Sequence, residues 1–421
     1  MFAKKIYTQP IANDRVRSPP SLHGLGFLVF VMFAVALSAN LVTPLLPTIL
    51  NQYSLPMRLQ TQHAAFLTGS YLLAMFIAAP TFGTISDRID RRTILLSAMA
   101  VYTMSLYALS AASGLIALYA SRILSGLGAG ALLPVMLAHV AEYSAPEQRP
   151  RRFAWIITAM MTGSLAGPYL GGMTTQSEMW ARIGASLPSN LMLAPVLAAA
   201  SICSVALIGM ALVFRRNTLS QPRFFGSPSV DVAIRPSALY MLSALSVVLM
   251  YAVGAFEVGL STLARQKLQL GAAQLGMMYA ECALVMLVMQ ALFFADPFKN
   301  FANRHLLFPA FVVTAIALVL FPLVDTHDRL AWVVALIASG AGVIAPLISY
   351  RVSVLADGQQ GKNFGLQSAA SYLGQALGSV GSGMLFVLSP QLPYWLAAAI
   401  MVAGAMWILF RMRPPPYVFD T

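Results

Sequence analysis

Long apolar runs recur along this chain and restrict the folds that are open to it. Twelve such runs, each of about 20 residues, are separated by short polar gaps. Inside a bilayer every backbone polar group needs a partner, and runs of this length are typical of membrane-spanning helices. The sequence therefore predicts an all-α integral membrane protein. The predicted spans are 25–48, 64–85, 93–113, 115–141, 153–174, 190–214, 237–263, 271–295, 305–324, 329–355, 363–388 and 391–411.

The composition is that of a chain whose main solvent is lipid, since 58% of the residues are hydrophobic and 10% are charged. The net charge of +12 would suit nucleic acid, but the basic residues lie in short gaps instead of clustering on one face. Cys203 and Cys282 both fall inside spans, so neither a disulfide framework nor a metal site is predicted. The first run is too long for a signal peptide, and we expect it to continue through Pro44 and Pro47 without a break.

The distribution of Lys and Arg predicts the orientation. With the N-terminus inside, the cytoplasmic segments hold 19 of the 26 basic residues, the opposite segments hold 5, and Arg122 and Arg351 fall within spans. This bias indicates that both termini are cytoplasmic, and the expected location is a cell membrane, the bacterial inner membrane. It also accounts for the net charge without a nucleic-acid partner.

The longest polar gap is rich in Pro, Gly and Ser and divides the chain into two halves of six spans. The expected organisation is a cytoplasmic tail (1–24), a six-helix bundle (25–214), a cytoplasmic linker (215–236), a second six-helix bundle (237–411) and a cytoplasmic tail (412–421).

The two halves match each other at nearly one offset, which favours an internal repeat of the kind found in carriers that rock about a central site. Gly128-Ala-Gly-Ala-Leu-Leu-Pro134 matches Gly340-Ala-Gly-Val-Ile-Ala-Pro346. In the following spans, the matched residues are Phe153, Gly163, Gly167, Gly172 and Met173 in the first half and Phe364, Gly374, Gly378, Gly383 and Met384 in the second.

The stretch Gly163-Ser-Leu-Ala-Gly167-Pro168-Tyr-Leu-Gly171-Gly172 predicts a close helix contact. Its glycines recur at helical spacing, so a second backbone can approach on that side, while the proline favours a bend. A similar stretch lies at 374–383, and we expect the two stretches to form the seams on which the halves close. We also expect the first stretch to prevent leak through the protein during exchange.

Three motifs resemble those of the major facilitator superfamily, and within it the twelve-span drug:proton antiporter branch. Gly83-Thr-Ile-Ser-Asp87-Arg88-Ile-Asp-Arg91-Arg92 is similar to the superfamily's loop signature, and Arg122-Ile-Leu-Ser-Gly126-Leu-Gly128-Ala-Gly130 to its arginine-and-glycine motif. The stretch from Gly163 to Gly172 resembles the antiporter motif, including Gly167, Pro168 and Gly171, which suggests export more than uptake. Asp90 replaces the usual glycine, so the turn there is expected to differ.

The resemblance implies that Asp87 acts as a gate latch. Its charge would face the N-terminus of the span at 363–388 and the neighbouring Arg88, Arg91 and Arg92, with Gly83 one turn before it. The alternative is a solvated loop charge. His139, Glu142 and Arg351 lie near the same membrane face and are either gate contacts or interfacial residues.

Proton coupling needs titratable groups inside the spans. An intramembrane arginine is costly unless it faces the interior, and the resemblance gives Arg122 a part in coupling; the alternative is that it snorkels to the headgroups. Glu257 and Glu281 are the carboxylates well inside spans. They could face each other and share a proton, or serve as structural hydrogen-bonding residues or lie at the water boundary. Asn40 stands where many exporters of the family carry a carboxylate, and an amide cannot titrate.

The substrate cavity is expected between the halves near mid-membrane, lined by aromatic rings and a few amides that suit amphipathic organic molecules. Aromatic residues in spans can instead be packing or interfacial, and the many methionines are expected to fill helix contacts. The candidates are Phe33, Asn40, Tyr71, Tyr240, Tyr251, Phe256, Tyr279, Gln290, Gln367, Tyr372 and Gln375.

The sequence contains neither a phosphate-binding loop nor a nucleophile elbow, so we expect no enzyme activity and no cofactor. The predicted function is proton-coupled export of small amphipathic compounds by a monomer that works by alternating access. Alternatives are a dedicated siderophore or metabolite exporter, an uptake carrier, or a transporter-like sensor or assembly protein.

Overall fold

The computed structural model describes residues 22–42, 45–51, 53, 57–144, 148–174, 194–213, 236–266, 268, 272–293, 303–355 and 359–411. Within these residues the chain is helical and contains no strand. A six-residue helix α2 (Leu46–Asn51) and a 3-10 turn η6 (Phe321–Leu323) accompany the long helices. The long helices are α1 (Leu22–Val42), α3 (Met57–Ser86), α4 (Arg91–Ser110), α5 (Leu115–Glu142), α6 (Arg149–Thr174), α8 (Ala194–Val213), α9 (Pro236–Gln266), α10 (Ala272–Phe293), α11 (Asn303–Leu320), α12 (His327–Leu355), α13 (Gln360–Leu388) and α14 (Leu392–Arg411).

The long helices correspond one to one with the predicted spans, and nine of those described are long and apolar enough throughout to cross a bilayer. Of the other three, α10 has a shorter apolar stretch, whereas α6 and α13 interrupt their apolar residues with glycines and polar side chains. Both of these helices lie at the boundary between the halves, where such residues are tolerated because protein surrounds them.

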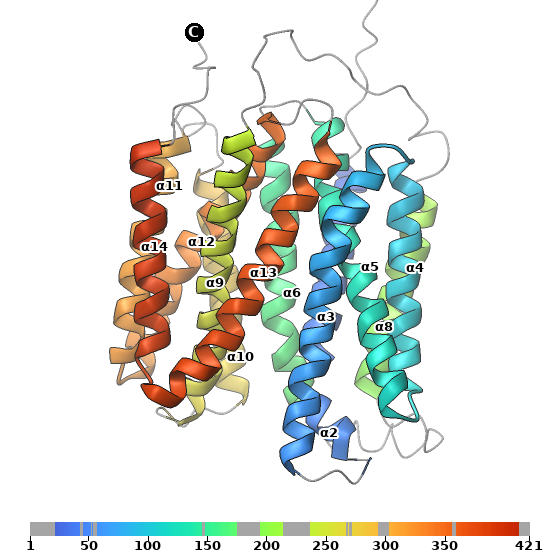
Figure 1. Ribbon diagram of the computed structural model, residues 1–421, viewed down its shortest axis with the longest axis horizontal. Coiled ribbons are helices and arrows are strands. Elements are labelled where there is room, and N and C mark those ends of the chain that lie inside the picture. Colours follow the sequence, from blue (N-terminus) through green and yellow to red (C-terminus); the bar gives the residue numbers. More distant parts are fainter. Residues whose placement is uncertain are drawn as a thin grey trace, which may run out of the picture.

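The helices form two bundles that repeat the same packing (Figure 1). Helices α1, α3, α4, α5, α6 and α8 pack together, and α9 to α14 form the second bundle. The most extensive contacts inside the bundles are α1 with α6 and α9 with α13, which are equivalent pairs under the sequence repeat. The prediction of two pseudo-symmetric six-helix bundles is confirmed.

The first predicted span corresponds to two described helices, and its expected continuity through Pro44 lies outside the described residues. Helix α1 ends at Val42, and α2 begins at Leu46, with Pro47 in its first turn. Proline has no backbone N–H donor, and its fixed φ suits the first turn of a helix, so Pro47 fits the start of α2.

The predicted seams between the halves are wrong for the central glycines of both stretches, because these glycines face a helix of their own half. A Cβ atom added to Gly163 or Gly167 would lie 2.5 or 2.6 Å from the carbonyl oxygens of Phe33 and Leu37 in α1. In the second half, Gly374 and Gly378 pack in the same way against backbone atoms of α9. Glycine spacing identifies the close face, but the partner is set by the packing of the whole bundle.

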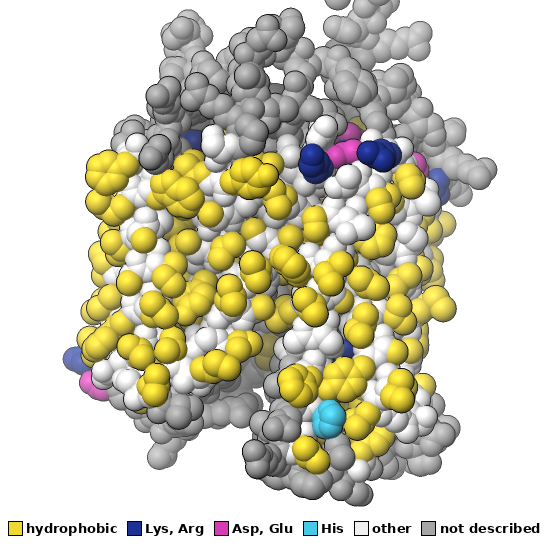
Figure 2. Space-filling view, in the orientation of Figure 1, with side chains coloured by type: hydrophobic (Ala, Val, Ile, Leu, Met, Phe, Trp, Pro, Cys, Tyr) yellow, Lys and Arg dark blue, Asp and Glu magenta, His cyan; other side chains and the backbone are white. Residues whose placement is uncertain are grey.

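The halves meet through α3 against α13, and through α6 against α10 and α12. In Figure 1, α13 runs obliquely, from beside α9 and α14 at the bottom of the view to α3 at the top. We call the end at which α3 stops and α13 starts the Asp87 end. Figure 2 shows apolar side chains over the flanks and charged side chains at the two ends, most of them at the top, as expected for a protein surrounded by lipid.

Candidate functional site

Asp87 joins the two halves at the Asp87 end. Its Oδ1 accepts the backbone N–H of Gly361 at 2.7 Å, and its Oδ2 accepts that of Lys362 at 2.9 Å. Both donors belong to the first turn of α13, where N–H groups have no partner within the helix and the helix dipole favours a negative charge. The carboxylate therefore lies where the resemblance to the superfamily implies, and it caps the helix of the opposite half.

Three glycines allow α3 and α13 to cross closely beside Asp87. A Cβ atom on Gly365 would lie 2.6 Å from the carbonyl oxygen of Ala79 and 2.9 Å from the Cα of Pro80. Gly83 and Gly361 likewise meet each other's backbone. Because backbone atoms cannot move aside as a flexible side chain does, any side chain at these positions would push the halves apart.

Arg91 connects Asp87 to the rest of its own half. Its Nη2 lies 3.2 Å from Oδ1 of Asp87 and 2.8 Å from Oε1 of Glu142, and its guanidinium is buried. Arg91 thus links the ends of α3 and α5 through the start of α4, with the buried ring of His139 nearby in α5. Arg88 is exposed and Arg92 half-buried, so Arg91 is the arginine of the loop motif that pairs with Asp87.

Asp90 has a local role that explains its replacement of glycine. It precedes α4 with φ −57° and ψ 121°, so the turn needs no left-handed backbone. Its side chain accepts the backbone N–H of Arg92, which caps the helix.

Further contacts close the boundary between the halves as α6 runs inward from the Asp87 end. Arg149 donates to the carbonyl oxygen of Ser353 in α12 at 3.4 Å. Deeper, the rings of Phe153 and Phe364 meet, and beyond them Thr158 donates a hydrogen bond to Gln290 of α10. Ala79 of α3 also packs with Ala369 and Tyr372 of α13.

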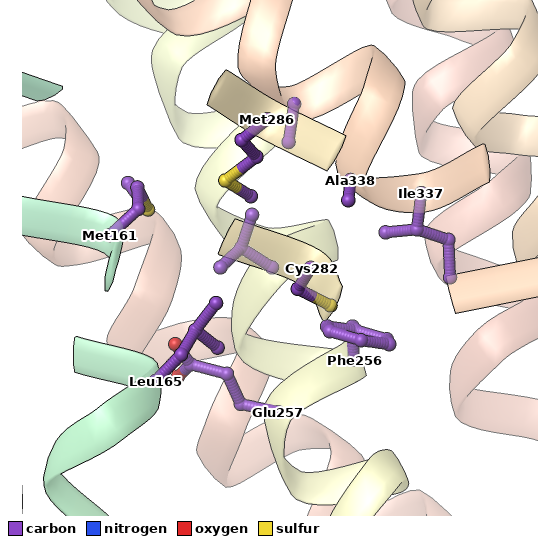
Figure 3. A pocket seen from close by; sticks show the side chains of 10 residues that line it. Met161, Leu165, Phe256, Glu257, Cys282, Met286, Ile337 and Ala338 are labelled. Carbon is purple, nitrogen blue, oxygen red and sulfur yellow. The ribbon is translucent and has the colours of Figure 1, made fainter. Parts of the chain in front are cut away.

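A small cavity of about 20 Å³ lies past these contacts, between α6 of the first half and α9, α10 and α12 of the second (Figure 3). Glu257 is the one carboxylate among its lining residues, and Figure 3 shows it reaching toward the side of α6 that carries Leu165. Its Oε2 accepts a hydrogen bond from Nε2 of Gln375 in α13 at 3.2 Å. The lining residues are Met161, Leu165, Val253, Phe256, Glu257, Cys282, Met286, Ile337, Ala338 and Ala341.

Glu281 does not share this site. It is half-buried in α10 next to Cys282, and it makes neither a hydrogen bond nor an ion pair with Glu257 or any other residue within the described ranges. Helices α9 and α10 do not pack extensively on each other, so the two carboxylates are not the facing pair that the topology suggested.

Arg122 is buried within the first half, with 1% of its surface exposed, so the snorkelling alternative is wrong. Its guanidinium carbon lies 4.5 Å from the centre of the Tyr71 ring, a cation–π arrangement, and its Nε has no hydrogen-bond partner among the described residues. A desolvated cation of this kind needs charge compensation, which is typical of functional positions in a membrane.

The family follows from a match over most of the chain. Residues 28–352 and 291–420 match the family model described as Major Facilitator Superfamily. This protein belongs to the major facilitator superfamily. Quinolone resistance protein NorA of Staphylococcus aureus (strain MRSA252) is 24% identical over 391 residues, which cover 92% of this chain and 96% of that protein. Multidrug resistance protein 1 of Bacillus subtilis (strain 168) is 22% identical over 383 residues, covering 90% and 94%.

Solved structures support the same fold. The human organic anion transporter MFSD10 (TETRAN) superposes with a TM-score of 0.75 at 20% sequence identity, covering 93% of this chain and 100% of that one. The resemblance deduced from the three motifs is thus confirmed. The protein is a multi-pass membrane transporter by family, and such proteins are not enzymes.

The predicted cavity residues of this superfamily member divide into several groups. Phe256 lines the cavity, and Gln375 donates a hydrogen bond to the carboxylate of Glu257. Tyr240, by contrast, lies near the start of α9 and is 64% exposed, so it does not line an enclosed cavity. Five candidates are buried: Tyr71, Tyr279, Gln290, Gln367 and Tyr372. Three are half-buried where α1 and α9 meet the glycine faces: Phe33, Asn40 and Tyr251.

The antiporter motif lies in α6. Gly171 is buried, Pro168 lies within the helix, and the surroundings of Gly172 are outside the described residues.

Sequence reasoning missed some residues that the structure brings to the boundary. Met161, Leu165, Cys282 and Met286 line the cavity, although methionine and cysteine in a span usually indicate packing. The Phe153–Phe364 contact could have been found, because the repeat matched these two residues.

Proposed function

We propose that this protein exports small amphipathic organic compounds in exchange for protons, by alternating access. The observation that carries the proposal is the combination of a carboxylate latch between the halves with a second, interior carboxylate in a mostly apolar cavity. The names of two bacterial relatives refer to quinolone and multidrug resistance, which favours export of drug-like compounds. The carrier is proposed to act as a monomer in the bacterial inner membrane without a cofactor.

The Asp87 end faces the cytoplasm in this proposal, because the Lys and Arg bias puts both termini on that side. The conformation described is then closed toward the cytoplasm by Asp87, Arg149 and the Phe153–Phe364 contact. Opening toward the cytoplasm would break these contacts while leaving most of the packing within each bundle in place, which is the rocking motion expected of such a fold.

Glu257 is the proposed proton carrier. It lies between the halves, and its surroundings are largely apolar, so binding a proton removes a charge that the site solvates poorly. Glu281 is a secondary candidate, since it is half-buried and has no partner among the described residues. Arg122 is proposed to assist coupling from the first half, where its buried charge would respond to a nearby substrate or proton.

Flux in proteoliposomes tests the proposal. With ethidium as the probe, an imposed pH gradient should drive accumulation of the dye, and collapse of the gradient should stop it. Glu257→Gln should abolish the response to the gradient while retaining dye exchange, because a glutamine side chain binds substrate without carrying a proton. Dye flux that is indifferent to the gradient would contradict proton coupling, and no flux of any probe in a panel of organic cations and anions would contradict export.

A further inference from the structure

Helix α13 connects the two carboxylates on which the proposed function depends. Its first turn donates to Asp87 of the first half, and Gln375 donates to Glu257 of the second. Gln375 follows Gly361 by 14 residues, so the two contacts are about 21 Å apart along the helix axis. A single helix thus donates hydrogen bonds to both carboxylates, and Figure 1 shows its oblique course between the two bundles.

The packing of α13 allows it to respond at both ends. Near the Asp87 end, Gly365 lies on Ala79 and Pro80 of α3. Further along, Gly374 and Gly378 lie on Val247 and Tyr251 of α9. Because these glycines bring α13 close to both α3 and α9, a shift of α13 against α9 also changes its position against α3.

Among the described residues, Gln375 is the one that forms a hydrogen bond with the side chain of Glu257. The groups that face Glu257 from α6 and α12 are apolar, and α10 contributes Met286 and the Cys282 thiol. From α14, the ring and hydroxyl of Tyr394 pack against Gly259, which is two residues after Glu257 in α9. Neither Glu281 nor any Lys or Arg within the described residues pairs with Glu257.

We propose that Gln375 is a positioning residue that transmits the protonation state of Glu257 along α13 to the Asp87 latch. This inference rests on the proposed function, because it takes Glu257 as the proton carrier. The bond from an amide N–H to a carboxylate is charge-assisted and weakens when the carboxylate becomes a neutral acid. Proton binding therefore loosens the hold of α9 on α13 and makes release of its first turn from Asp87 easier.

Distance measurements between the halves test the coupling directly. Arg151 in α6 and Val354 in α12 are exposed at the Asp87 end, so spin labels at Arg151→Cys and Val354→Cys report its opening. Cys203 and Cys282 are buried and are retained. In proteoliposomes without substrate, acidification should lengthen this distance in the parent protein. Gln375→Leu should lose most of that change, whereas Ser371→Ala should keep it, because the Ser371 hydroxyl donates only to its own helix, to the carbonyl oxygen of Gln367.

A second variant keeps the test informative if Gln375→Leu does not fold. In Gln375→Glu the new side chain has the same length as glutamine, and its carboxyl group would share a proton with Glu257. Because two neighbouring carboxylates favour the protonated form, the pH midpoint of the distance change should rise by about one unit or more. A parent-like midpoint and amplitude in both Gln375 variants, with the response lost in Glu257→Gln, would overturn the role of Gln375 alone. A parent-like response in Glu257→Gln would overturn the proposed proton carrier and this inference with it.

Discussion

Phe153 of α6 and Phe364 of α13 meet edge to face across the boundary between the halves, with ring centroids 5.6 Å apart and an interplanar angle of 78°. Both side chains are fully buried, and they are equivalent positions of the internal repeat. Two equivalent residues can touch only near the axis that relates the halves. This contact therefore marks where the bundles pivot or separate at the Asp87 end.

Removing this aromatic pair should favour opening of the Asp87 end. The geometry of an aromatic pair contributes about 1 kcal/mol beyond burial. In a double-mutant cycle, Phe153→Ala and Phe364→Ala should therefore show a coupling free energy of that size for the equilibrium between the closed and open states. Spin-label distances at Arg151→Cys and Val354→Cys would measure the ratio. Phe311→Ala is the matched control, since Phe311 is equally buried but packs within the second half. An equal shift in the control would indicate general loosening instead.

Asp87→Asn should weaken the closed state. The substitution removes the charge that faces two N–H groups of α13 and the guanidinium of Arg91, while preserving side-chain size. The loss should be about 2 kcal/mol, roughly 30-fold in the closed-to-open ratio, and dye transport should slow. Asp90→Asn is the control, because asparagine caps a helix as well as aspartate does. Unchanged conformer populations in Asp87→Asn would contradict the latch.

Gly365→Ala should hinder closure without disrupting either bundle. Its new methyl group would lie against backbone atoms of α3, so the halves could close only by shifting α13 or α3. Gly383→Ala is a matched control in the same helix, since a Cβ there meets nothing within 4 Å. Cross-linking of the halves at the Asp87 end should fall in Gly365→Ala and remain at the parent level in Gly383→Ala. Equal cross-linking in both variants would exclude a tight α3–α13 crossing.

The sequence predicted the features that depend on nearby residues in the chain. It was less successful with features that depend on which side of a helix faces which neighbour in the bundle. Apolar length located the helices, and Asp87 lies where its motif implies. Hydropathy and topology placed Glu257 and Glu281 at similar depths, but the direction of each side chain around its helix depends on neighbours far away in sequence. The same limit applied to Tyr240, which was predicted to line the cavity but is 64% exposed.

Gly167→Ala should destabilise the first bundle, and Gly378→Ala the second. Each new methyl group would meet the backbone of a helix in its own half, α1 for Gly167 and α9 for Gly378. Overpacking of this kind costs about 1–3 kcal/mol, so each variant should unfold at a lower temperature in detergent. Gly69→Ala provides the reference, because nothing lies within 4 Å of its added Cβ. If the glycines instead sealed the boundary between the halves, both variants would unfold like the parent and conduct protons in the absence of substrate.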